Sequence, residues 1–201
     1  MIAWSDVIAW AGALVIGLVL GSAPFGLLLT RAAGLGDIRA IGSGNIGATN
    51  VLRTGRKGLA AATLLLDGSK GFVAVIIAGT WLGSDAGWMA ALGAVLGHCH
   101  SIWLKGKGGK GVATGLGVLL AAMWPVGVAC CVIWLAMARL VRISSVAALT
   151  ALAAAPVLTY LAGDLFGALI TLLIAIQIAV RHRANISRLL AGTEPRIGAK
   201  S

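Results

Sequence analysis

Charged side chains are scarce in this chain. Asp, Glu, Lys and Arg make up 11% of its 201 residues, whereas hydrophobic residues make up 59%. A soluble domain of this length could not bury so much apolar surface, so the composition excludes a soluble globular protein. It predicts an all-α integral membrane protein, with residues 1–201 forming a single polytopic membrane domain.

Acidic residues and cysteines are rarer still. The chain has 6 acidic residues against 16 Lys and Arg, which gives a net charge of +10. Cys99, Cys130 and Cys131 lie within apolar runs, where thiols act as small hydrophobes, and their spacing indicates neither a disulfide framework nor a zinc site. His98 and His100, two residues apart, would lie on different faces of a helix. We therefore expect no metal and no cofactor.

Long apolar runs set the number of membrane spans, because a helix needs about 20 apolar residues to cross a bilayer. Such runs cover residues 7–30, 58–82, 88–104, 112–140, 144–162 and 165–180. The first has no early basic region and no small-residue cleavage site, so we expect a retained span. The run 112–140 is too long for one span and contains Pro125, so we expect it to divide at Met123–Val126 into two short helices. This gives about seven transmembrane helices.

The distribution of basic residues favours seven spans over six. With seven spans and the N-terminus outside, every Lys and Arg except Lys70 falls on the cytoplasmic side, where basic residues accumulate. The outer loops then hold Asp6, Asp85 and Asp164. With six spans the basic C-terminal tail would lie outside; its basic residues are Arg181, Arg183, Arg188, Arg196 and Lys200. We predict an outside N-terminus and a cytoplasmic C-terminus.

Two charged residues lie inside the second span. Asp67 and Lys70 are three residues apart, share one face of a helix and can form an ion pair, and an unpaired charge there would be expensive. The pair is either a structural pin between helices or part of a path through the membrane.

Three short polar islands interrupt the apolar chain, all on the predicted cytoplasmic side. The first, SGNIGATN (43–50), offers hydroxyl and amide groups and glycines for tight turns, and Arg53 follows it. Such a loop can bind a phosphate. Alternatively it is a turn between helices in which Ser43 or Thr49 caps the next helix.

The second island, KGKGGKGVAT (105–114), contains a GxGxxG pattern. It lacks the preceding strand of a dinucleotide fingerprint, and it fails the Walker pattern because Val112 follows Gly111. What remains is a glycine-rich loop with three lysines that opens into a helix, whose free amides and dipole attract anions. The lysines are Lys105, Lys107 and Lys110.

The third island, RHRANISRL (181–189), ends the last span. His182, Asn185 and Arg188 follow one another at a spacing of three and would share one face if the helix continues. The alternative is a basic helix end whose side chains reach the lipid headgroups.

The segments SGNIGATN, GHCHSIWLKGKGGKGVATGLG and AVRHRANISRLLAGTE resemble, in this order, the three signature regions of the bacterial acyl-phosphate:glycerol-3-phosphate acyltransferases, the PlsY family. The family usually has an aromatic residue where this chain has Gly106, and often a proline near Ser101. The resemblance implies a multi-pass enzyme of the bacterial inner membrane with cytoplasmic active-site loops at 31–57, 105–114 and 181–196. It would transfer a fatty acyl group from acyl phosphate to the 1-position hydroxyl of glycerol 3-phosphate, giving lysophosphatidic acid and phosphate, the first step of phospholipid synthesis.

The resemblance also implies roles for residues. The implied catalytic residues are Ser43, Asn45, His182 and Asn185. The implied substrate-binding residues are Gly44, Gly47, Thr49, Arg53, Lys107, Gly108, Gly109 and Lys110. An acyl phosphate already carries a stable leaving group, so no covalent acyl-enzyme is needed. We expect the leaving phosphate to take the hydroxyl proton, with His182 as an orienting donor; His182 as general base is the alternative.

The expected partners are acyl phosphate, glycerol 3-phosphate and membrane lipids, with a functional link to the enzyme that makes acyl phosphate; nucleic acid is not expected. Two other classes of protein remain open. A small organic-anion transporter would use the Asp67–Lys70 pair and the broken fourth helix. A scaffold that binds anionic lipid would need the basic patches but not SGNIGATN.

Overall fold

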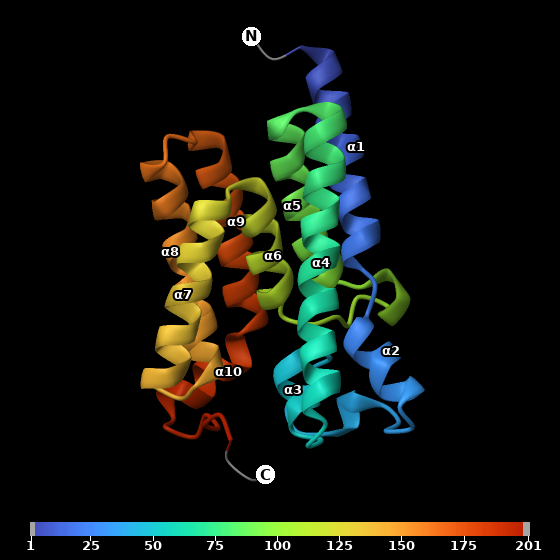
Figure 1. The fold of residues 1–201 in the computed structure, drawn as a ribbon, viewed down its shortest axis with the longest axis vertical. Coiled ribbons are helices and arrows are strands. Elements are labelled where there is room, and N and C mark those ends of the chain that lie inside the picture. Colours follow the sequence, from blue (N-terminus) through green and yellow to red (C-terminus); the bar gives the residue numbers. More distant parts are fainter. Residues whose placement is uncertain (1–2, 199–201) are drawn as a thin grey trace.

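The computed structural model describes residues 3–198, and this part of the chain is helical with no strand. Figure 1 shows the helices arranged mostly along one direction, with the start of α1 and the end of α10 at opposite ends of the molecule. In chain order the elements are α1 (Trp4–Gly21), α2 (Phe25–Ala32), the 3-10 turn η1 (Ile38–Ala40), α3 (Ala48–Leu52), α4 (Lys57–Leu82), α5 (Ser84–Cys99), the 3-10 turn η2 (Ile102–Leu104), α6 (Val112–Ala122), α7 (Trp124–Leu140), α8 (Ser144–Leu161), α9 (Leu165–Arg181) and α10 (Arg183–Leu190).

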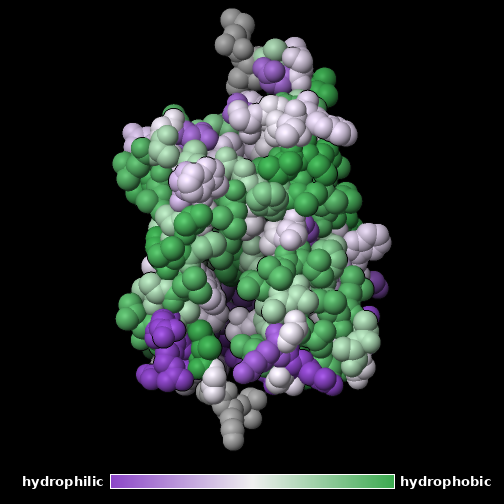
Figure 2. Space-filling model, in the orientation of Figure 1, coloured by the Kyte–Doolittle hydropathy of each residue, from purple (hydrophilic) through white to green (hydrophobic). Residues whose placement is uncertain are grey.

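The lengths and the surface of these helices fit a membrane protein. Three segments, Trp4–Ala32, Lys57–Leu82 and Ser144–Leu161, are long and apolar enough to cross a bilayer, and α9 with α10 qualifies as a bent pair. Figure 2 shows hydrophobic residues over most of the visible face and hydrophilic residues gathered toward its ends. Large apolar side chains such as Leu65 and Trp81 are exposed. A soluble protein would not expose so many of them.

The predicted division of residues 112–140 is confirmed. Helix α6 ends at Ala122 and α7 begins at Trp124, with Pro125 in the first turn of α7, where its missing N–H leaves no hydrogen bond unmade. Two other predicted spans differ from the structure. The first span is broken between Gly21 and Phe25, next to Pro24. The third span ends at Cys99 and does not reach residue 104.

Glycines allow α1 and α5 to pack backbone against backbone. Gly17 and Gly21 of α1 face α5, and Gly93 and Gly97 of α5 face α1; a methyl group at any of the four would overlap the partner helix's main chain. Both pairs have the GxxxG spacing that permits close approach of helices in a membrane. Helix α6 uses the same device, because a methyl group at Gly117 would overlap the carbonyl of Gly68 in α4.

We expect Gly21→Ala to destabilise the protein by about 1–3 kcal/mol, because the added methyl group forces α1 away from the Ala94 carbonyl. The melting temperature of detergent-solubilised protein checks this. Gly12→Ala, on the same helix, is the matched control because a methyl group there has no atom within 4 Å. Equal melting temperatures for the two variants would show that the α1–α5 contact is not tight.

Candidate active site

The three polar islands lie around a hollow in the half of the molecule that contains α3 and α10. Figure 2 shows this hollow in the lower part of the visible face, with hydrophilic side chains inside it. Helices α5 and α6 are short, with 16 and 11 residues, and the loop between them lies near mid-height in Figure 1. The short helices therefore leave room beneath the loop for polar groups from the other elements.

The first island is folded around the side chain of Asn50. Its amide nitrogen donates to the carbonyls of Ile38 (3.0 Å), Ile41 (3.0 Å) and Asn45 (2.8 Å), and its Oδ1 accepts from the Ser43 amide at 3.0 Å. Asn50 is 2% exposed, so these bonds are shielded from water. One buried side chain therefore fixes the shape of the loop, whereas Ser43 stays exposed. The local sequence pattern did not indicate this role for Asn50.

The structure contradicts the alternative in which Ser43 or Thr49 caps the next helix. Gly47 is the N-cap of α3, and no side chain bonds the helix there. Thr49 Oγ1 instead lies 3.3 Å from Ser144 Oγ at the start of α8, which links the first island to the far side of the hollow. Arg53 follows α3, and a methyl group at Gly42, whose φ is 55°, would lie 2.8 Å from its guanidinium.

The glycine-rich loop does not present its amides freely. Gly108 N donates to the carbonyl of Cys99 at 3.2 Å and Gly109 N donates to that of His98 at 2.9 Å, so these amides satisfy carbonyls at the end of α5 that have no partner within the helix. Arg181 donates to the carbonyls of Gly108 (2.8 Å) and Gly109 (3.0 Å). These two amides are therefore occupied, and they are distinct from the amides of the α6 N-terminus that the sequence indicates as anion-binding groups. The loop positions its lysines, and Gly111 caps α6 with φ 85°.

Lys110 is the point at which the three islands meet electrostatically. The pKa of its ammonium group is lowered to about 8, chiefly by burial; Arg188, Arg53 and Arg181 also lower it, whereas Glu194 raises it. Arg53 directly follows the first island, and Arg188 and Arg181 belong to the third. Lys107, by contrast, is exposed and makes no hydrogen bond or ion pair through its side chain within residues 3–198.

The third island bends instead of continuing as one helix. Helices α9 and α10 meet at an angle of 63° at His182, which is buried. His182 Nδ1 lies 2.8 Å from the Ile178 carbonyl, which only accepts, so Nδ1 carries the proton and the neutral ring presents Nε2 as an acceptor. Burial lowers the pKa of His182, as does the charge of Lys110, against raising effects of the Ile178 hydrogen bond and Glu194. Burial and Lys110 thus favour the neutral ring, in which Nε2 would orient a hydroxyl as an acceptor instead of the expected donor.

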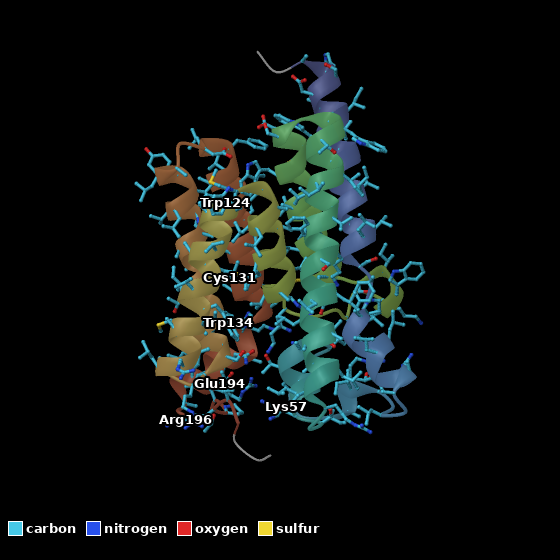
Figure 3. The ribbon with its side chains drawn as sticks, viewed as in Figure 1. Lys57, Trp124, Cys131, Trp134, Glu194 and Arg196 are labelled. Carbon is cyan, nitrogen blue, oxygen red and sulfur yellow. The ribbon has the colours of Figure 1, made fainter. Side chains whose placement is uncertain are left out.

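Glu194 holds the third island together, a role that the local sequence pattern did not indicate. It accepts from Asn185 Nδ2 (2.6 Å), Ser145 Oγ (2.8 Å) and Arg188 Nε (2.7 Å). Burial alone would raise its pKa, but these hydrogen bonds lower it below the usual value. Figure 3 shows Glu194 beside the lower part of α7 and α10, across the hollow from Lys57. The one feature of the sequence that could have indicated this role is that Glu194 is a single acidic residue in a basic C-terminal segment.

Asn185 is oriented by this carboxylate. Its amide nitrogen is taken by Glu194, and its buried Oδ1 has no hydrogen-bond partner among the described residues. An amide oxygen without a partner in a buried site can accept a bond from a ligand hydroxyl. The predicted shared face of His182, Asn185 and Arg188 holds in part. Asn185 and Arg188 both meet Glu194, whereas His182 lies at the bend before α10.

The family model described as glycerol-3-phosphate acyltransferase matches residues 11–192. The chain belongs to this family. It is 62% identical to a glycerol-3-phosphate acyltransferase of Mesorhizobium japonicum over 94% of this chain and 96% of that one. For a Ruegeria pomeroyi glycerol-3-phosphate acyltransferase the identity is 58%, over 96% and 94%.

Solved structures of PlsY, an integral membrane glycerol 3-phosphate acyltransferase, have the same fold. Its glycerol 3-phosphate form matches with a TM-score of 0.89 and 36% identity, over 94% of this chain and 96% of that one. Its lysophosphatidic acid form matches with a TM-score of 0.87 and 35% identity, over 94% and 95%. The predicted membership of the PlsY family is confirmed.

In this acyltransferase, we expect Asn50→Asp to lower activity by about a hundredfold, because three amide donations are lost and the first island shifts. Initial rates of acyl transfer by purified protein check this. Leu52→Ala, at an exposed position of the same helix, is the control and should keep its activity. A fully active Asn50→Asp protein would mean that the loop shape does not matter.

Proposed function

We propose that this chain transfers a fatty acyl group from acyl phosphate to the 1-position hydroxyl of glycerol 3-phosphate, releasing lysophosphatidic acid and phosphate without a covalent acyl-enzyme. The observation that carries the proposal is that Arg53 and Arg188 both act on the charge of Lys110, while Thr49 of the first island contacts Ser144, next to the Ser145 that binds Glu194. The PlsY structures in glycerol 3-phosphate and lysophosphatidic acid forms support the acceptor and the product.

Two anionic substrates must meet in this site. Acyl phosphate is a mixed anhydride whose leaving group is a stable phosphate, so the main tasks are to bring the anions together and to orient a hydroxyl. Ser43 and Asn45, with the turns at Gly44 and Gly47, hold the acyl phosphate. The phosphate of glycerol 3-phosphate binds Arg53 and Lys110, and Lys107, Thr49, Gly108 and Gly109 complete the loop walls.

His182 and Asn185 orient the attacking hydroxyl. His182 Nε2 accepts a hydrogen bond from it, because Nδ1 is committed to the Ile178 carbonyl. Asn185 Oδ1 is a second acceptor, fixed by Glu194. The oxygen attacks the acyl carbon, the bond from that carbon to the phosphate oxygen breaks, and the leaving phosphate takes the proton. Both nucleophile and proton acceptor then come from the substrates.

We further propose seven spans in the bacterial inner membrane, with the N-terminus outside and the site facing the cytoplasm. The spans are α1 with α2, then α4, α5, α6, α7, α8 and α9. Two observations support this orientation. Asp6 and Asp85 line one cleft at the end opposite α10, and the segments 31–57 and 181–196 lie at the α10 end. The predicted cytoplasmic Lys200 lies outside the described residues.

Palmitoyl phosphate and glycerol 3-phosphate should together release inorganic phosphate from purified protein. Each substrate alone and the Asn45→Ala variant are the controls, and palmitoyl-CoA is the parallel donor. Release that needs both substrates supports the proposed donor. Turnover of palmitoyl-CoA without turnover of palmitoyl phosphate would contradict it.

The value of kcat/KM for glycerol 3-phosphate should fall above pH about 8, because Lys110 then loses the charge that binds the phosphate. Below that pH the ammonium is charged and binding is retained. Lys110→Arg should move the alkaline limb to higher pH, since a guanidinium stays protonated. An alkaline limb that is identical in both proteins would assign it to another group.

A further inference from the structure

The ion pair inside the apolar bundle contacts both ends of the glycine-rich segment. Asp67 Oδ1 lies 2.9 Å from Lys70 Nζ and 3.7 Å from His98 Nδ1, and His98 is in the last turn of α5, before the loop. The carbonyl of Asp67 accepts from Thr114 Oγ1 at 2.8 Å, in the first turn of α6, after the loop. One residue of α4 therefore holds the start and the end of a segment of the candidate site.

Lys70 extends the cluster to the break between α1 and α2. Its Nζ donates to the carbonyl of Ala23 at 2.7 Å, a group that the interrupted helix leaves without a partner. Ser101 Oγ, just after α5, donates to the Ser22 carbonyl in the same break at 2.6 Å. The break, the end of α5 and the pair in α4 are thus joined by polar contacts.

Charges in this position are a poor way to stabilise a bundle. The side chains of Asp67 and Lys70 are 2% and 4% exposed, and the cost of removing two charges from water is commonly as large as their attraction. Apolar residues of similar volume would pack at least as well. A role in geometry accounts better for a buried pair whose contacts reach both ends of one loop and the break between α1 and α2.

His98 contacts the loop itself. A methyl group at Gly109 would overlap the imidazole at Nε2, so the ring lies directly against the backbone next to Lys110. The main-chain bond from Gly109 N to the His98 carbonyl, 2.9 Å long, fixes the same two residues in register. A movement of the ring toward or away from Asp67 would therefore shift Gly109 and, with it, the backbone of Lys110.

We propose that Asp67, Lys70 and His98 are positioning residues that set the place of the glycine-rich loop, and with it Lys110, relative to α4 and the first island. The proposal rests on the proposed function, in which Lys110 binds the phosphate of glycerol 3-phosphate. It assigns the Asp67–Lys70 pair to the acyltransferase site and not to a transport path through the membrane.

A double-mutant cycle between His98 and Gly109 tests the contact. Gly109→Ala alone should raise the KM for glycerol 3-phosphate about tenfold, because the methyl group displaces the loop from the imidazole. In a His98→Ala background the same change should have less than about a twofold effect, since the ring is gone. Gly108→Ala is the matched control: it meets the main-chain carbonyl of His98, so both backgrounds should suffer equally. Equal effects of Gly109→Ala in both backgrounds would overturn the proposal.

A milder variant covers the case in which His98→Ala does not fold. Thr114→Val removes the hydroxyl that binds Asp67 and should raise the KM for glycerol 3-phosphate about threefold with kcat nearly unchanged. Thr159→Val in α8, whose hydroxyl bonds only its own helix at Ala155, is the control and should leave both constants unchanged. An unchanged KM in Thr114→Val would count against the positioning role.

Melting temperatures of the four proteins of the cycle separate the two proposals. They report the contact between His98 and Gly109 whether or not the protein turns over any substrate. Loss of stability in Gly109→Ala that His98→Ala relieves would support the contact, and loss that it leaves unrelieved would refute it. An inactive native protein would refute the proposed function alone.

Discussion

Repulsion among cations is the constraint on which the site depends. Arg53, Arg181 and Arg188 all lower the pKa of Lys110, and Glu194 is the carboxylate that opposes them. Glu194 also ties Ser145 of α8 to Asn185 and Arg188 of α10. Glu194 therefore holds these basic side chains near one another. Their remaining positive charge can attract an anion.

Short helices create the space for these charges, and glycines make the short helices possible. Helices α5 and α6 are short and meet the hollow at the loop between them. Their glycine contacts with α1 and α4 bring the backbones close together, so the short helices still pack tightly. The buried Asp67 cluster then determines where the loop between α5 and α6 lies. Fold and site thus share the same elements, with the loop as the junction between them.

Local patterns in the sequence were sufficient to predict the class of protein, the division near Pro125, the Asp67–Lys70 pair and the family. Each depends on residues that are close in sequence. The roles of Asn50 and Glu194 depend on partners brought together by folding, since Ser145 lies 49 residues from Glu194. The bonds of the Gly108 and Gly109 amides depend on folding in the same way, because their partner carbonyls at the end of α5 come near only when the loop folds back. The bend at His182 also has no proline or glycine beside it to indicate it.

The central claim is that the three islands form one phosphate-binding site around Lys110. An experimental structure of this protein with bound glycerol 3-phosphate tests it most directly. The account predicts the phosphate group in contact with Lys110 and Arg53, and the hydroxyl end near His182 and Asn185. A phosphate bound away from Lys110, for example at Arg56 and Lys57 beside the start of α4, would contradict it.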